Sequence, residues 1–242
     1  MDFSEFKSLF CNSLQQNGIS LLDDNALETF HLFVEHLMAV NAVTNLTAVR
    51  NVPDVITKHL VDSLFVSEHL PQDARVLDLG CGPGFPSIPL AVARPDLQIV
   101  ALDSTAKKIA FVQETCSKLN ISNLTAISGR AEDRAISAKI GEFDAVVSRA
   151  VARMNVLSEL CLPYVRIGGS LIAMKAAKAE EELAEAERGI QTLGGGTPTL
   201  HKRELALTDN SKEPRCLIAI PKARKTPPAY PRAYAAILKK PL

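Results

Sequence analysis

The chain has 242 residues, of which 47% are hydrophobic, so it can bury a core without disulfide bonds or metals. Its 27 basic and 27 acidic residues balance, which argues against a general nucleic-acid-binding protein, and its five scattered cysteines form no Cys-x-x-Cys pair, which argues against a zinc site or a disulfide framework. The N-terminus carries acids early and no apolar run of about 18 residues occurs, so we predict no signal peptide, no membrane contact and a reducing cytoplasm.

Residues 1–70 are predicted to form a small helical cap. Apolar side chains recur there at helical spacing, and Asp23 or Asp24 is placed to cap that helix; the apolar positions are Leu27, Phe30, Val34 and Leu37. A second helix is expected to begin near Pro53, because proline is favourable in the first turn. It carries Ile56, Leu60 and Leu64 on one face.

Residues 71–221 are predicted to form the main domain. Short apolar runs alternate with helical stretches between residues 74 and 174, which predicts a parallel sheet with helices on both faces and right-handed crossovers. Residues 176–193 form an Ala/Glu-rich helix that a run of glycines should end. Two closely spaced strands follow, near Leu205 and at residues 216–220, and we expect them to pair antiparallel at the sheet edge.

A glycine loop follows the first strand of this domain. From Asp78 to Phe85 the sequence is Asp-Leu-Gly-Cys-Gly-Pro-Gly-Phe, and Gly80, Gly82 and Gly84 allow a tight turn and close approach of a ligand. A dinucleotide site needs Gly-x-Gly-x-x-Gly, whereas here the third glycine comes one residue early and Phe85 takes its place. The Asp78 carboxylate suits the cationic amino acid end of S-adenosylmethionine better than a pyrophosphate. The loop therefore favours this sulfonium cofactor over NAD.

Two later positions support a nucleoside site. Asp103, at the end of the second strand, can accept hydrogen bonds from both ribose hydroxyls, which either nucleoside cofactor requires. Ala131 and Glu132 follow the third strand, near the adenine end in this architecture. Together with the glycine loop they predict a Rossmann-like class I methyltransferase of the α/β class, with a mostly parallel seven-stranded sheet and an antiparallel edge pair. We predict no metal site.

The charges are unevenly distributed along the chain. Residues 1–74 hold 3 Lys or Arg against 10 Asp or Glu, whereas residues 201–242 hold 10 against 3. The proline-rich end, residues 222–242, is expected to be extended or weakly ordered when free. It is either a solvated surface or a face that holds phosphates through Lys222, Arg224, Lys225, Arg232, Lys239 and Lys240.

Several further motifs lie along the chain from about residue 20 to its end. They are Asn45-Leu46-Thr47-Ala48, His59-x-x-Asp62-Ser63, the glycine loop continuing to Ile88-Pro89-Leu90, Leu102-Asp103-Ser104 with Lys107-Lys108, Ser148-Arg149-Ala150, Lys175, and the ending Thr-Pro-Pro-x-Tyr-Pro-Arg. With them the chain resembles the ribosomal RNA small subunit methyltransferase G family, also called glucose-inhibited division protein B. Two positions depart from the family pattern: Val40-Asn41-Ala42 replaces Trp-Asn-Lys, and Ser87 replaces glycine. We expect the first to weaken a contact near the RNA and the second to alter helix packing only.

The resemblance implies methylation of N7 of one guanine in bacterial 16S ribosomal RNA with S-adenosylmethionine. The partner is then the 16S ribosomal RNA or the small ribosomal subunit, and we expect a monomer. The family's cofactor contacts fall on Gly80, Phe85, Ala131, Glu132 and Arg149.

Guanine N7 has a lone pair and no proton, so the reaction needs orientation and no general base. We assign catalytic roles to Arg149, which would close the junction between cofactor and base, and to Lys175. Lys175 and Arg130 are candidates for phosphate or guanine O6 contacts, and we count Arg130 and Arg232 as substrate-binding. His59 either packs on a helix face or helps to shape the base pocket. The target guanine should be unpaired, because duplex RNA hides N7 in a deep groove.

Three alternatives share parts of this pattern. A class I methyltransferase acting on a small molecule or a protein would use the same cofactor residues. A non-catalytic nucleoside-binding or RNA-scaffold protein would keep the fold without turnover. An NAD-dependent oxidoreductase is disfavoured by Asp78 and Phe85.

Overall fold

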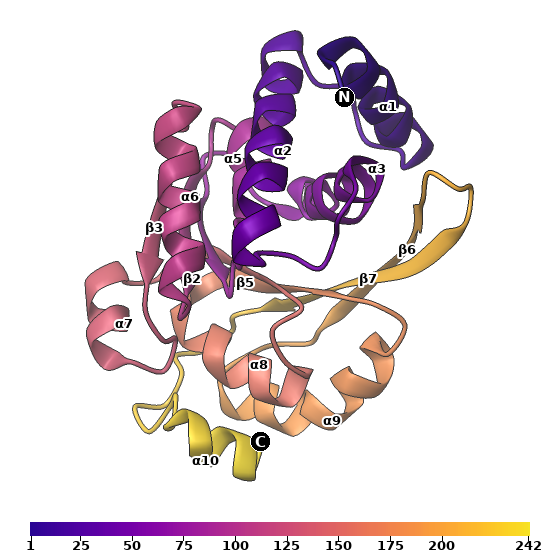
Figure 1. Ribbon diagram of the computed structural model, residues 1–242. Helices are drawn as coiled ribbons and strands as arrows, with labels where there is room; N and C mark the ends of the chain where they lie inside the picture. Colours follow the sequence, from indigo (N-terminus) through magenta and orange to yellow (C-terminus); the bar gives the residue numbers. More distant parts are fainter.

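A seven-stranded sheet forms the centre of the structure, a computed structural model that describes residues 1–242 (Figure 1). The strand order is β3-β2-β1-β4-β5-β7-β6. The strands are β1 (Arg75–Leu79), β2 (Gln98–Asp103), β3 (Leu124–Ser128), β4 (Phe143–Arg149), β5 (Val165–Lys175), β6 (Thr199–Ala206) and β7 (Lys212–Pro221). The first five run parallel, and β7 pairs antiparallel with both β5 and β6. The predicted sheet with its antiparallel edge pair is confirmed.

Helices cover both faces of the sheet. Side chains alternate between the faces along each strand, so Ala145 and Val147 of β4 join one buried cluster while Val146 joins the other. The first cluster takes in α5 (Ser87–Ala93) and α6 (Ala106–Lys118), and the second takes in α7 (Arg134–Ile140), α8 (Met154–Cys161) and α9 (Ala179–Thr192). None of the helices is both long and apolar enough to cross a membrane.

The N-terminal segment is a helical cap that packs on the first of these faces (Figure 1). Its main helices are α1 (Phe3–Gln16) and α2 (Asp24–Thr44). Asp23 caps α2, because its carboxylate accepts a hydrogen bond from the Ala26 amide at 2.8 Å. Phe6 and Phe30 are buried in the same apolar cluster as Val76 of β1, so cap and sheet share one core.

The second helical stretch of the cap is interrupted by a wider turn. It runs through α3 (Val52–Val55), the π-helical segment η1 (Ile56–Val61) and α4 (Asp62–Leu64), followed by the short 3₁₀ turn η2 (Ser67–His69). Such π-helical turns are rare and occur frequently at functional sites. Apolar spacing predicts the helix here, and Ile56, Leu60 and Leu64 are buried as expected, but the spacing does not reveal the π-turn.

The C-terminal segment, expected to be extended or weakly ordered when free, contacts the main domain in the structure. It includes the helix α10 (Tyr234–Lys239), and its Arg232 pairs with the fully buried Glu159 of α8. Lys222 is also buried, and its ammonium donates to the carbonyls of Leu162 and Leu193 at 2.5 and 3.2 Å. Burial lowers the pKa of Lys222 to about 8. Lys222 therefore anchors the tail and does not face a phosphate.

Candidate active site

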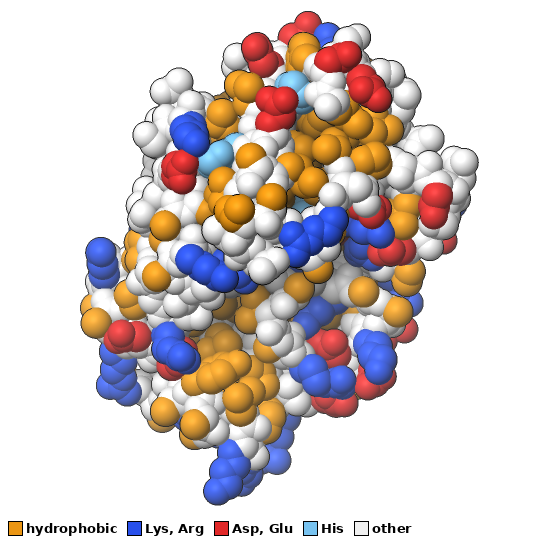
Figure 2. All heavy atoms as spheres, viewed as in Figure 1, with side chains coloured by type: hydrophobic (Ala, Val, Ile, Leu, Met, Phe, Trp, Pro, Cys, Tyr) orange, Lys and Arg blue, Asp and Glu red, His pale blue; other side chains and the backbone are white.

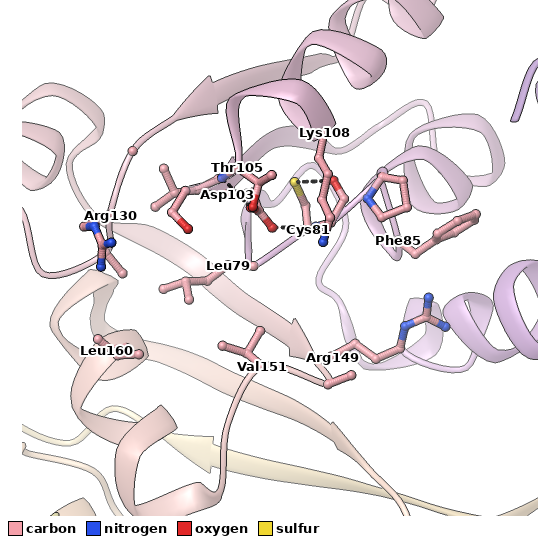
Figure 3. Close-up of a pocket in the computed structure, with 18 of the residues that line it drawn as sticks. Leu79, Cys81, Phe85, Asp103, Thr105, Lys108, Arg130, Arg149, Val151 and Leu160 are labelled. Carbon is pink, nitrogen blue, oxygen red and sulfur yellow. Dashed lines mark hydrogen bonds between the residues drawn. The ribbon is translucent and has the colours of Figure 1, made fainter. Parts of the chain in front are cut away.

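A cavity of about 540 Å³ lies at the carboxyl ends of β1, β2 and β4, where parallel sheets bind ligands (Figure 3). The glycine loop forms one wall of the cavity. Gly80 and Gly82 both adopt positive φ, +79° and +56°, a backbone conformation that glycine adopts without strain. A Cβ at Gly80 would collide with the Val151 side chain, which lies directly against this glycine, whereas a Cβ at Gly82 would meet no atom within 4 Å. A ligand can therefore lie directly against the backbone at Gly82.

Asp103 fixes the loop to the end of β2. Its Oδ2 accepts a hydrogen bond from the Gly82 amide at 2.9 Å, and its Oδ1 accepts one from the Thr105 amide at 2.7 Å. A carboxylate has about four acceptor positions, so two remain for ligand hydroxyls. Asp103 lines the cavity, in agreement with the expected ribose contact.

Asp78, the acid expected to meet the cationic end of a ligand, does not line the cavity. It lies fully buried behind the loop, where its Oδ2 accepts a hydrogen bond from the Ser87 amide at the start of α5, at 2.9 Å. Its Oδ1 has no hydrogen-bond partner, and burial raises the pKa of this carboxyl to about 7. Asp78 therefore holds the turn from loop to helix. Gly84, the third glycine of the loop, does not line the cavity and lies against Ile88.

Arg149 lies at the end of β4, between the cavity and the cap (Figure 3). Its Nη1 donates to the Lys58 carbonyl at 3.1 Å and to Oδ2 of Asp62 at 3.0 Å. Its guanidinium carbon lies 5.4 Å from the centre of the Phe85 ring. The π-turn, through Lys58, and the first residue of α4, Asp62, thus supply the two acceptors that orient this arginine.

His59 extends the same junction. Its ring stacks on Phe85 with centroids 4.5 Å apart, and its Nε2 lies 2.8 Å from the Thr47 hydroxyl. Burial, and then the nearby charge of Arg149, lower the pKa of His59 to about 4. The imidazole is therefore neutral at physiological pH.

A second cavity, of about 720 Å³, adjoins the first. Four residues line both cavities, namely His59, Arg149, Ala150 and Val151. The far side of the second cavity is formed by the end of β5, the first half of β7 and the start of α9, with Lys175, Arg215 and Glu182. Asp62 lies between two guanidinium groups there, because its Oδ1 also accepts from Nε of Arg215 at 2.8 Å.

The structure brings most of the expected site residues together. The first cavity is lined by His59, Gly80, Gly82, Phe85, Asp103, Arg130, Ala131, Glu132 and Arg149. Lys175 lines the second cavity only, and Arg232 lines neither, because its side chain pairs with Glu159. Sequence reasoning missed Arg215 and Glu182, and no local pattern identifies them, because only the folded sheet brings them to this edge. No cluster of three or more metal-binding side chains occurs.

The cavity has what an S-adenosyl ligand requires. One end has Asp103 and Glu132 for hydroxyl and amino groups, and the glycine backbone leaves room for a flat nucleoside. The other end opens at Arg149 onto the second cavity, so a group transferred there can reach an acceptor. This fold and this pair of cavities define a class I S-adenosylmethionine-dependent methyltransferase.

Comparison with known proteins places the chain within this class. The profile of the family described as rRNA small subunit methyltransferase G matches residues 26–206. Proteins called ribosomal RNA small subunit methyltransferase G from Lachnoclostridium phytofermentans and Brevibacillus brevis are 43% and 40% identical to this chain, over 97% and 98% of it and 97% and 99% of theirs. The chain belongs to the rRNA small subunit methyltransferase G family.

Solved structures agree on the fold. An O-methyltransferase from Bacillus cereus in complex with SAH is similar with a TM-score of 0.56 at 16% identity, covering 90% of this chain and all of that one. A precorrin-6y C5,15-methyltransferase from Geobacter metallireducens is similar with a TM-score of 0.53 at 18% identity, covering 67% of this chain and 88% of that one.

Proposed function

We propose that this protein transfers the methyl group of S-adenosylmethionine to N7 of an unpaired guanine in bacterial 16S ribosomal RNA. The observation that carries the proposal is the position of Arg149, which lines both a nucleoside-sized cavity and an adjoining cavity large enough for a base. The names of the relatives, which are ribosomal RNA small subunit methyltransferases, support the same substrate.

The bound cofactor would supply an electrophilic methyl group on a positively charged sulfur. Guanine N7 attacks with its lone pair and releases no proton, so the protein needs to orient the base and exclude water rather than remove a proton. The neutral His59, stacked on Phe85, adds an uncharged ring to the junction, which helps to exclude water there. Arg149, held by Asp62 and Lys58, is oriented to position the base at the mouth of the first cavity.

Basic side chains support an RNA substrate. Arg130 lies at the end of the first cavity away from Arg149, and its side chain is 65% exposed (Figure 3). Lys108 lines the same cavity and Lys58 the second one. Figure 2 shows further Lys and Arg side chains across the middle of one face, between the cap and the layer below it. Such groups hold phosphates flanking an extruded base, and their binding weakens with salt.

Arg232 is not part of this proposal, because both its guanidinium and its amide bind Glu159.

Since the proposed substrate is made and assembled in the cytoplasm, we infer that the protein acts there, as a monomer, on 16S ribosomal RNA or the small subunit.

A methyl-transfer assay tests the proposal. The purified protein is incubated with S-adenosylmethionine labelled in its methyl group and one of three substrates: deproteinised small-subunit RNA from cells lacking the protein, the same RNA from unmodified cells, or a pool of free metabolites. Label should enter only the first RNA, as N7-methylguanosine. Label in the metabolites and none in the RNA would instead identify a small-molecule methyltransferase.

A further inference from the structure

The second cavity is lined by an ion pair, Lys175 and Glu182, in which each side chain keeps hydrogen-bonding capacity that the protein does not use. Lys175, at the end of β5, donates to the Ala152 carbonyl at 2.5 Å and to Oε2 of Glu182 at 2.7 Å. An ammonium has three hydrogens, so one remains free. Oε2 of Glu182 also accepts the Met154 amide at 3.1 Å, whereas Oε1 accepts no hydrogen bond from the protein.

This pair is largely buried and held in place by the backbone. The side chains of Lys175 and Glu182 are only 9% and 15% exposed, and both line the second cavity. The two bonds to backbone groups, one from each partner, fix the pair in place before any substrate binds. The cavity therefore presents a fixed donor beside a fixed acceptor.

The other carboxylates of the second cavity are less suited to bind a base. Asp62 already uses both oxygens, for Arg149 and Arg215. Glu213 pairs with Arg215, and its side chain is 40% exposed to solvent. Glu182 thus combines a low exposure with an unused oxygen.

We propose that Lys175 and Glu182 together recognise the target guanine: Lys175 donates to O6, and Oε1 of Glu182 accepts from N1–H and the N2 amino group. Guanine carries these groups side by side as an acceptor followed by donors. Adenine carries the reverse order, a donor at position 6 beside an acceptor at N1, and would place donor against donor at Lys175. This inference rests on the proposed function, and it assigns to the pair the choice of guanine over adenine.

The arrangement also agrees with the position of the reacting atom. O6 and N7 lie on the same edge of guanine, so a base held at O6 by Lys175 directs N7 away from Glu182. The residues that line both cavities, among them Arg149 and Val151, lie between this site and the glycine loop, at the junction where the cavities meet. Lys175 therefore contributes to substrate selection although it lines only the second cavity.

The test compares Glu182→Gln with a matched control, Glu180→Gln. Glu180 lies in the same turn of α9 but pairs with Lys202 at the surface, where its side chain is 65% exposed. For Glu182→Gln, kcat/KM on small-subunit RNA should fall by about 5-fold to about 150-fold, the range of a well-formed bidentate base contact. Its affinity for S-adenosylhomocysteine should be unchanged, and the control should match the natural protein. Equal kcat/KM for both variants would overturn the inference.

A nucleotide substitution tests the same contact without relying on a variant's folding. In semisynthetic RNA the mapped target guanine is replaced by inosine, which lacks the N2 amino group. The natural protein should methylate inosine at least about 5-fold less efficiently, and Glu182→Gln should lose most of that difference. An equal rate on both nucleotides with the natural protein overturns the inference alone. Absence of N7 methylation on guanine itself overturns the proposed function as well.

Discussion

Replacing Arg149 by alanine should separate activity from stability. The substitution removes a hydrogen bond to a carboxylate at 3.0 Å and one to a carbonyl at 3.1 Å. Asp62 is not left as an unpaired buried charge, because Arg215 still holds its other oxygen at 2.8 Å. The free energy of unfolding should therefore fall by about 1.5–3 kcal/mol, the value of a charge-assisted hydrogen bond. This is less than the loss of about 3–5 kcal/mol expected when a buried charge loses its only partner.

The loss of methyl transfer should be larger. Without its orienting contact the base can shift by about 1 Å, and such a displacement slows a reaction about 100-fold. We therefore expect kcat/KM on small-subunit RNA to fall by about that factor. Urea unfolding measures the first quantity and labelled methyl transfer the second. Arg166→Ala is the control, because Arg166 pairs with Asp144 at the surface, remote from both cavities, with its side chain 50% exposed. If Arg149→Ala and Arg166→Ala had the same kcat/KM, Arg149 would have no role at the junction.

Three further predictions concern the loop, the buried acid and the tail. Gly80→Ala should abolish binding of S-adenosylhomocysteine, measured by calorimetry. The new methyl group collides with Val151, and the residue needs a positive φ that alanine rarely adopts. An affinity equal to that of the natural protein would refute this prediction. The carboxyl of Asp78 has a pKa of about 7 when folded against 3.8 as its ordinary value, so the folded state binds more protons and stability should fall as pH rises from 3.8 to 7. Urea unfolding of Asp78→Asn across that range should show a smaller decrease than the natural protein, and equal slopes would contradict the reasoning. Arg232→Ala leaves Glu159 buried without its partner and should cost about 3–5 kcal/mol of stability while the salt dependence of RNA binding stays the same; a changed salt slope would restore a phosphate role.

Local patterns predicted the parts of the site that local chemistry determines. The strand before Gly80, the acid at the end of β2 and the loop itself each need one residue type at one backbone position, and all lie where the sequence indicated. The cap helix beginning after Asp23 follows from apolar spacing and a capping carboxylate in the same way.

The remainder depends on contacts between distant segments. Arg215 reaches Asp62 across 153 positions of the chain, and Arg232 reaches Glu159 across 73. Both arginines look like surface charges in the sequence, and their burial is decided by a carboxylate that packing places beside them. The place of Asp78 depends on packing in a related way: a carboxylate next to a glycine loop can point into the cavity or support the loop from behind, and here the buried amide of Ser87 holds it behind the loop.

The central claim is that this chain methylates N7 of a guanine in 16S ribosomal RNA. The most direct measurement maps N7-methylguanosine along 16S ribosomal RNA from cells with and without the protein, and from cells carrying Arg149→Ala. The account predicts one modified guanine that disappears in cells lacking the protein and is strongly reduced in the variant. A modification pattern identical in all three would contradict it.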